Sequence, residues 1–191
     1  MSEKTISEPE TVVLSDPRAI IALAHPARLA IIDALYAGDE LTATQAGVLT
    51  GLTPSATSYH LRALERWGIV RRAGNAVDGR ERPWRAAGKS LQVDSAAPRV
   101  SEAAEASLVS TVFDRDRAEV LSFVGRHDGE PAEWREALTL SSGKYWLTTA
   151  EVDAVMDELK RTLEPYRDRR RPQDRPPGSR SVRVSLTAIP L

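Results

Sequence analysis

The chain has 191 residues, 41% of them hydrophobic and 28% charged, and a formal net charge of −1. These values are typical of globular proteins, and the length suffices for one compact domain or two small ones. The absence of cysteine excludes disulfides and thiol catalysis, and with no apolar run of membrane-spanning length and no secretory leader we expect a cytoplasmic protein.

The sequence predicts that each of the first two helices begins at a residue pair whose second member is proline. Residues 1–14 are polar and acidic at their start, and we expect them to be disordered. An Asp-Pro pair at residues 16–17 then opens a helix, because Asp is a good N-cap residue and Pro suits the first helical position. A second helix starts at the His-Pro pair of residues 25–26, with His25 as a cap or packing residue, and ends at Gly38.

A short helix and a longer helix follow. Thr42 and Gln45 have the spacing of a capping box, and Gly51 ends the short helix. A Thr-Pro pair then starts the longer helix, expected over residues 54–67. Two helices joined by a brief Gly-bearing turn predict a helix-turn-helix unit. Its buried positions are expected to be Ala46, Leu49, Thr57, Leu61 and Leu64.

Residues 69–87 predict a β-hairpin directly after this unit. Two extended runs flank the turn sequence AGNAVDG, and Pro83 marks an edge strand. The hairpin makes residues 15–90 a winged helix-turn-helix domain. Between residues 54 and 89, eight basic side chains stand against three acidic ones. This local positive excess suits a polyanionic partner, although a solvated charged face is the simpler alternative.

The second helix of a helix-turn-helix lies in the DNA major groove, where small polar residues let its backbone approach the base edges. At the wing, arginines are expected to reach phosphates or a narrow minor groove. His60 is expected to bond a phosphate or neighbouring backbone. The candidate DNA-contacting residues are Ser55, Ser58, Tyr59, His60, Arg62, Arg80 and Arg82.

The C-terminal half predicts a separate region. Residues 91–100 are small and polar, typical of a linker, and residues 101–191 are expected to form a small α/β dimerisation region. Its predicted elements are a long helix over 101–127, a short helix in 131–138, an extended run over 139–148, a helix opened by the capping box of Thr148 and Glu151, and a final strand over 181–191 that pairs with the extended run. The fold class is therefore α+β, mainly α.

Residues 16–91 resemble the bacterial winged helix-turn-helix repressors of the ArsR type. The motifs HPARLAII, SATSYHLRAL and GIVRR carry the likeness, in this order. The resemblance implies a homodimeric transcriptional regulator whose exposed recognition-helix positions and wing tip contact DNA. It leaves open whether the protein binds a small-molecule effector.

Two further constellations admit a functional and a structural interpretation. The resemblance implies a metal site in some relatives, and Asp114, Asp116, His127 and Glu130 match one such spacing, but coincidence in a charged helix is the favoured interpretation. Four aromatic residues, Phe123, Trp134, Tyr145 and Trp146, either line an effector pocket or form a small core, which is favoured.

The sequence predicts a DNA-binding regulator without catalytic activity. It contains no P-loop, no dinucleotide fingerprint and no assignable nucleophile–base pair, so we expect neither an enzyme nor a cofactor. The long helix carries apolar residues on more than one side, which predicts a homodimer and hence a palindromic operator. The alternative is a winged-helix protein-interaction module without DNA binding.

Overall fold

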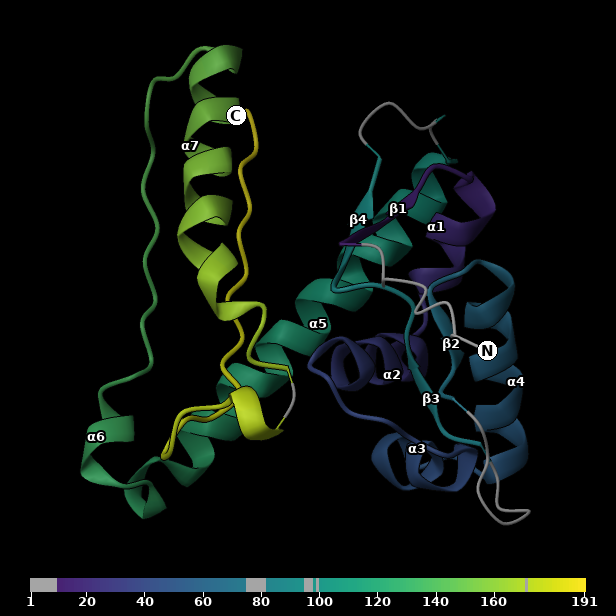
Figure 1. The fold of residues 1–191 in the computed structure, drawn as a ribbon. Helices are drawn as coiled ribbons and strands as arrows, with labels where there is room; N and C mark the ends of the chain where they lie inside the picture. The colour runs from purple at the N-terminus through teal and green to yellow at the C-terminus, as the bar shows by residue number, and fades with distance from the viewer. Residues whose placement is uncertain (1–9, 75–81, 95–97, 99, 171) are drawn as a thin grey trace, which may run out of the picture. The chain divides into compact units, whose positions relative to one another are not determined.

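The computed structural model describes residues 10–74, 82–94, 98, 100–170 and 172–191. The chain divides into two compact units (Figure 1). The first unit comprises residues 1–112 and 167–181, and the second unit comprises residues 113–166 and 182–191. Within the described residues, no single helix is both long and apolar enough to cross a membrane, whereas the first two helices, bent by 93°, meet that test jointly by length and composition.

Four short helices build the first unit. In chain order they are α1 (Pro17–Leu23), α2 (Pro26–Tyr36), α3 (Ala43–Thr50) and α4 (Pro54–Arg66). Each begins at a side chain that accepts a backbone N–H, which satisfies one of the free donors at a helix N-terminus. These four caps, Asp16, His25, Thr42 and Thr53, are the residues that the sequence predicts.

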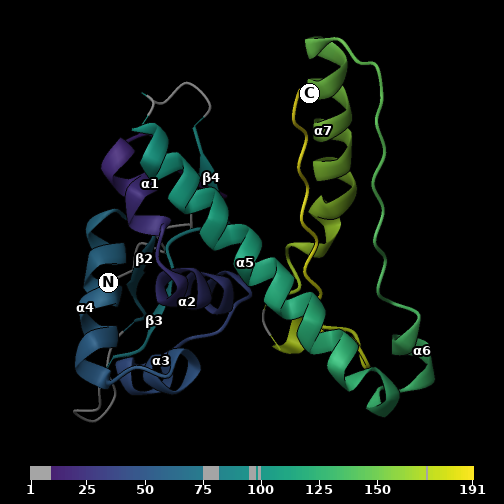
Figure 2. The same cartoon turned by 180° about the vertical axis from the view of Figure 1, so that it is seen from behind.

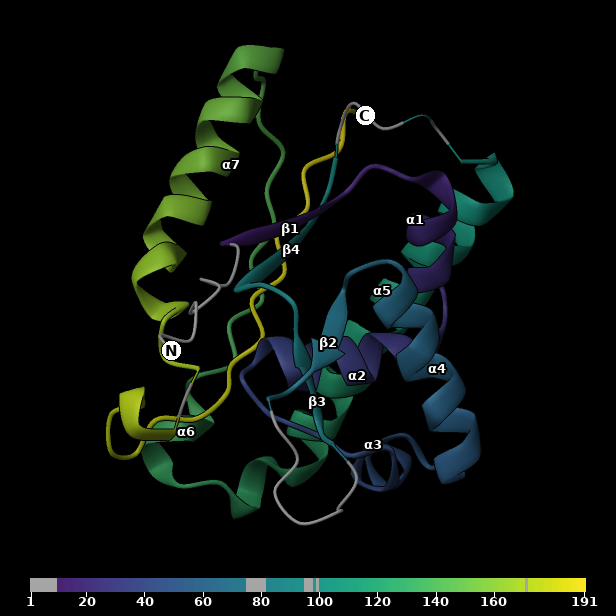
Figure 3. The same cartoon turned by 45° about the vertical axis from the view of Figure 1, so that its right-hand side comes forward.

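Two small sheets complete the first unit (Figure 3). The antiparallel pair β2 (Val70–Arg72) and β3 (Trp84–Ala86) confirms the predicted hairpin, in which Val70 faces Ala86. Leu41 and Trp84 exchange backbone hydrogen bonds of 3.0 and 2.7 Å, which join β3 to the residues that precede α3 in the chain. The parallel pair β1 (Thr11–Leu14) and β4 (Ser90–Val93) forms the second sheet.

The core of the first unit lies between the four helices and β3. Its largest fully buried side chains include Ile31, Leu35, Leu61, Leu64 and Trp84. Burying a large aliphatic or aromatic side chain of this kind contributes about 1.5–3 kcal/mol. Tyr36 adds a polar tie, since its hydroxyl donates to the Ile69 carbonyl at 2.8 Å, and burial raises the pKa of Tyr36 to about 12.

Three expectations for the first unit are corrected. Residues 11–14 are not disordered but form β1, and residues 91–93 of the expected linker belong to its partner β4. Leu14 explains the pairing, because it is buried while Val12 and Leu91 pack against the same core. Leu49 on α3 is 48% exposed instead of buried, whereas Ala46 is fully buried as expected.

The second unit is mainly helical. It contains the C-terminal half of α5 (Glu102–Arg126), whose N-terminal half belongs to the first unit, followed by η1 (His127–Gly129), α6 (Ala132–Arg135), α7 (Thr149–Leu163) and η2 (Glu164–Tyr166). The long helix, the short helix and the capping box of Thr148 and Glu151 are confirmed. Leu108 and Val112, in the first half of α5, pack against the core of the first unit.

The expected strands of the second unit are wrong. Residues 139–148 and 182–191 run as extended segments along α7 (Figures 1 and 2), but neither forms a sheet ladder with any described residue. Alternation of apolar and polar residues predicts an extended backbone correctly, but a strand also needs a paired neighbour. None of residues 113–166 and 182–191, all of which are described, is buried.

Candidate nucleic-acid interface

Helix α4 has one buried side and one exposed side. Thr57, Leu61 and Leu64 are fully buried, which confirms the predicted inward positions. Ser55 and Arg62 are exposed, Ser58 is partly exposed, and the Tyr59 ring is 60% exposed. Since residues three and four apart share a helix face, the four polar side chains form one continuous outer surface. We call Ser55, Ser58, Tyr59 and Arg62 the α4 outer face.

Thr57 fixes α4 against α3. Its hydroxyl donates to the Ala43 carbonyl at 2.7 Å, and the bond is buried. Gly47 allows the close approach at the turn, because a Cβ there would lie 2.8 Å from the Leu52 carbonyl oxygen. Gly51 then takes φ +69° as the C-cap of α3, a conformation that favours glycine. These contacts set the angle at which the α4 outer face is presented.

His60 lies on the buried side of α4 and does not belong to the α4 outer face, although it was expected to contact DNA. Only 8% of the residue is exposed, and its ring lies 4.4 Å from the His25 ring. Arg28 Nε lies 3.4 Å from His60 Nδ1, a long hydrogen bond, while Arg28 Nη1 donates to the Ala22 carbonyl at 2.8 Å. His60 therefore joins α4 to the start of α2.

This histidine pair is electrostatically disfavoured in its charged form. Burial lowers the pKa of His25, and the Arg28 guanidinium lowers it further. Burial likewise lowers the pKa of His60, with His25 and Arg28 adding to the effect. In the neutral form, His25 Nδ1 accepts the Ala27 N–H at 3.2 Å and caps α2.

The wing exposes an arginine next to a strand pair that side-chain contacts hold in place. Arg82 is exposed, and its carbonyl accepts a 2.7 Å hydrogen bond from Arg72 Nη1. The Arg72 guanidinium carbon also lies 3.8 Å from the centroid of the buried Trp84 ring, a cation–π contact. Arg80 lies outside the described residues.

The candidate metal ligands of the second unit are not grouped into a metal site. Asp116 accepts from Arg115 at 2.8 Å and from Ser185 at 2.6 Å; burial alone would raise its pKa, but these bonds hold the pKa below the usual value. Glu130 accepts from Arg126 at 2.8 Å. Within the described part of the chain, no three His, Asp or Glu residues are grouped to hold a metal ion.

The four aromatic residues of the second unit do not form a buried core. Trp146 is fully exposed and Tyr145 is 78% exposed, while Phe123 and Trp134 are only half-buried. The favoured interpretation of a small core is therefore wrong for the single chain, since no residue of this unit is buried.

The fold and the polar outer face of α4 define a winged helix-turn-helix of the kind used by DNA-binding transcription regulators. Residues 25–81 match the model of the MarR family, and the match supports a DNA-binding transcription regulator. The winged helix-turn-helix class is thus confirmed, but the matching family is MarR rather than ArsR. The motifs that carried the resemblance lie within the helix-turn-helix core, which identifies the class of fold but not the family.

Two solved structures are similar to this chain at low identity. A transcriptional regulator of the MarR family from Silicibacter pomeroyi is 17% identical with a TM-score of 0.33, over 78% of this chain and 82% of its own. A second MarR family transcription regulator is 16% identical with a TM-score of 0.32, over 80% of this chain and 78% of its own. No curated protein matches the chain.

Proposed function

We propose that the protein is a homodimeric transcriptional repressor that reads a palindromic operator with α4 and has no catalytic activity. The observation that carries the proposal is the α4 outer face, where small hydroxyls, a tyrosine and an arginine are exposed above three fully buried side chains. Small side chains allow the helix to enter a major groove about 12 Å wide. A protein-docking surface would instead be expected to be apolar at these positions.

Each polar group of the α4 outer face suits a particular role at the DNA. Ser55 and Ser58 lie at the N-terminal end of the helix, which points toward the bases in this class of fold. Tyr59 offers a hydroxyl and a ring edge, and Arg62 offers the fork that pairs with guanine or a phosphate. Arg82, with Arg80, supplies charge to the flanking backbone or the minor groove.

The dimer is proposed from the second unit. Large apolar side chains are exposed there along α5, α7 and the last segment, including Leu121 at 55%, Val124 at 54% and Val182 at 62%. A soluble monomer rarely exposes so many apolar groups together, and a second copy would cover them. The cytoplasm, and the nucleoid within it, is the compartment where such a dimer would meet its operator.

The test is selection of a duplex from a random DNA pool by the full-length protein, followed by titration. We expect an imperfect palindrome, because a two-fold dimer presents each recognition helix once. Tyr59→Ala or Ser58→Ala should weaken binding to the selected duplex by about 1–3 kcal/mol and leave binding to a scrambled duplex nearly unchanged.

The matched control for these substitutions is Tyr145→Ala, which removes an exposed tyrosine from the second unit. It should leave both affinities unchanged. If folded Tyr59→Ala and Ser58→Ala proteins keep the wild-type ratio of specific to non-specific affinity, α4 does not read the operator.

A further inference from the structure

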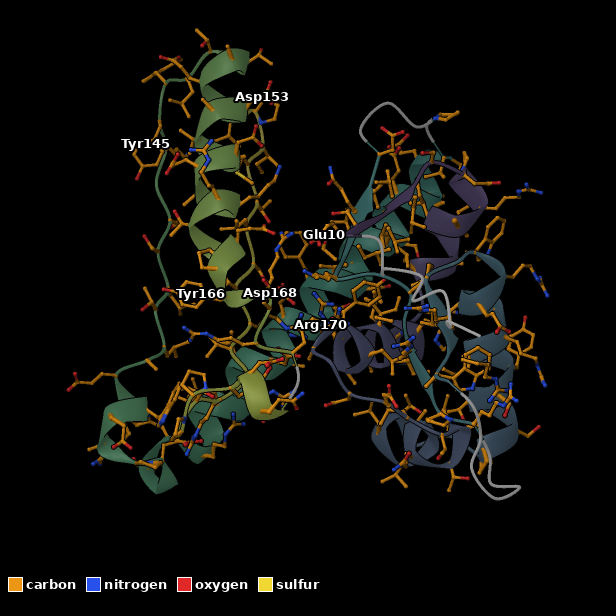
Figure 4. All side chains as sticks on the ribbon, in the orientation of Figure 1. Glu10, Tyr145, Asp153, Tyr166, Asp168 and Arg170 are labelled. Carbon is orange, nitrogen blue, oxygen red and sulfur yellow. The ribbon has the colours of Figure 1, made fainter. Side chains whose placement is uncertain are left out.

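Residues 167–181 return from the second unit to the first unit and are part of it. We call this segment the strap. Arg170 is its principal contact (Figure 4): Nη2 donates to the Leu35 carbonyl at 3.2 Å, and Nη1 donates to the Gly88 carbonyl at 3.1 Å. A planar guanidinium is suited to such bridging, because its donors are fixed in one fork. One side chain therefore joins the last turn of α2 to the turn between β3 and β4.

A second arginine, Arg175, bonds both to the strap's own backbone and to the end of α2. Arg175 Nη2 donates to the Arg170 carbonyl at 2.6 Å and to the Ala37 carbonyl at 3.2 Å. Its guanidinium also lies 3.9 Å from Asp39, just beyond the end of α2. The backbone that carries Arg170 is thus held in place from within the strap.

Gly38 shows how closely the strap is seated. It has φ +104°, and a Cβ at this position would lie 2.2 Å from the Arg170 carbonyl oxygen. Any other residue would be strained in its backbone and would also displace the strap. The end of α2 therefore has the shape that receives this segment.

Lys89 adds a charged contact beside Gly88. Its ammonium lies 2.9 Å from Asp168 in the strap and 3.0 Å from Glu10 (Figure 4). Both carboxylates are largely exposed, so these ion pairs contribute little to stability. The bonds from Arg170 to the two carbonyls are the more consequential contact.

The strap contacts the chain at the base of the wing, where β3 ends. Gly88 lies two residues after the end of β3, and Ala87 between them donates its N–H to the Ile69 carbonyl at 3.1 Å. Within β3, Trp84 exchanges backbone hydrogen bonds with Leu41. A solvent-open pocket of about 470 Å³, lined by Leu35, Arg85 and strap residues among others, lies at this junction. The strap and the end of β3 therefore border the same pocket.

We infer that the strap positions the wing for DNA and that Arg170 is the positioning residue. The strap directly follows α7 and η2 in the chain, so it is a covalent link between the second unit and the residues at the wing base. The hydrogen bonds from Arg170 to the Leu35 and Gly88 carbonyls, and from Arg175 to the Ala37 carbonyl, lie at the end of α2 and in the β3–β4 turn, not on the α4 outer face. This inference rests on the proposed function and deepens it.

The experiment measures the affinity of full-length Arg170→Ala for the duplex selected by the wild-type protein. We expect a loss of about 2- to 30-fold, the usual size of an effect transmitted through packed contacts. Gly38→Ala should act in the same direction, because it displaces the strap while leaving the Arg170 side chain intact. Arg161→Ala is the control, since it removes an exposed arginine on α7 that pairs with Glu158.

A double-mutant cycle separates wing positioning from general destabilisation. In an Arg82→Ala background, the effect of Arg170→Ala should shrink, because the wing contact that it positions is already absent. In a Tyr59→Ala background, the effect should remain complete. Arg170→Lys, which keeps a donor, should restore part of the affinity and provides a second reading if Arg170→Ala does not fold.

Three outcomes would overturn the inference. The first is wild-type affinity for the selected duplex in both the Arg170→Ala and the Gly38→Ala protein, each folded. If Arg170→Ala does not fold, Arg170→Lys takes its place in this comparison. The second is full additivity with Arg82→Ala. The third is failure of the wild-type protein to select any duplex, which contradicts the proposed function itself and is recognised before any variant is made.

Discussion

The two units of this chain both contain amphipathic helices, but only the first unit buries their apolar side chains. In the first unit, α4 places Leu61 and Leu64 in a core where neither is exposed. In the second unit, α7 has a capping box, an amphipathic pattern and apolar residues at helical spacing, yet Leu159 is 41% exposed and Val155 is 46% exposed. Local signals therefore suffice to form a helix, whereas burial depends on what packs against it.

This difference assigns separate tasks to the two units. The first unit encloses its own core and presents polar groups outward, as an independently stable DNA-binding module would. The second unit exposes apolar groups on α5, α7 and the last segment, which is the basis for proposing that a second copy covers and stabilises it. Each of the following substitutions has a counterpart in the other unit, and the contrast between the two is the measurement.

The largest effect is expected from Leu61→Ala. Removing this fully buried side chain should lower the free energy of unfolding by about 2–5 kcal/mol, through lost burial and the cavity left behind. Leu159→Ala in dilute protein should change it by only about 0.5 kcal/mol, as for an exposed position. Urea unfolding of both variants at low concentration checks the contrast, and equal losses would contradict the distinction between the units.

The dimer is tested by Val124→Asp in the second unit. A carboxylate placed in a covered apolar surface loses hydration and the burial of a valine, so dimerisation should weaken by about tenfold or more. Val48→Asp is the counterpart, because Val48 is 83% exposed on α3 of the first unit. Sedimentation over a range of concentrations should show a changed dimer constant for Val124→Asp alone; a wild-type protein that is monomeric at micromolar concentration would refute the dimer.

Most of the first unit was predictable because its signals are local. Asp16, Thr42 and Thr53 cap their helices through side chains within three residues of the N–H that they accept. Thr57 and Leu61 were assigned to the buried side by spacing alone. His60 was misplaced, because its burial depends on His25 and Arg28 arriving from another helix.

The parts that sequence did not predict depend on distant partners. Strand β1 forms only because β4, 79 residues later, lies beside it, with Thr11 opposite Ser90. The Pro- and Arg-rich segment that contains Arg170 had the composition of a loop, and nothing near it in sequence indicates the Leu35 carbonyl that it bonds. The expected C-terminal strands failed for the same reason: alternation predicts an extended chain but supplies no neighbour.

The next effect is smaller and concerns charge at the wing. Arg82→Ala should weaken binding to every duplex and lower the slope of log affinity against log salt by about 1, because one phosphate contact is lost. Arg161→Ala in the second unit removes the same charge without a contact to DNA, so the slope should stay at its wild-type value. An unchanged slope in Arg82→Ala would remove the wing from the proposed interface.

The smallest effect is a pH dependence that separates the histidine pair of the first unit from His127 of the second. Burial and Arg28 lower the pKa of His25 and His60 below the ordinary value of 6.5. As the pH falls below about 6.5, the unfolded chain binds protons that the folded chain does not, so the free energy of unfolding decreases. The contribution is complete above this pH and is lost as the pH falls through the lowered pKa values.

Urea unfolding between pH 7.5 and 5 therefore measures whether the pair is neutral in the folded protein. His60→Gln should flatten the decrease, because the glutamine cannot be protonated and leaves His25 with one cationic neighbour fewer. His127→Ala, which replaces an exposed residue in η1 of the second unit, should retain the wild-type decrease. A decrease that His60→Gln leaves unchanged would mean that the ring packed 4.4 Å from His25 does not govern the acid sensitivity of the first unit, and that carboxylates elsewhere in the chain do.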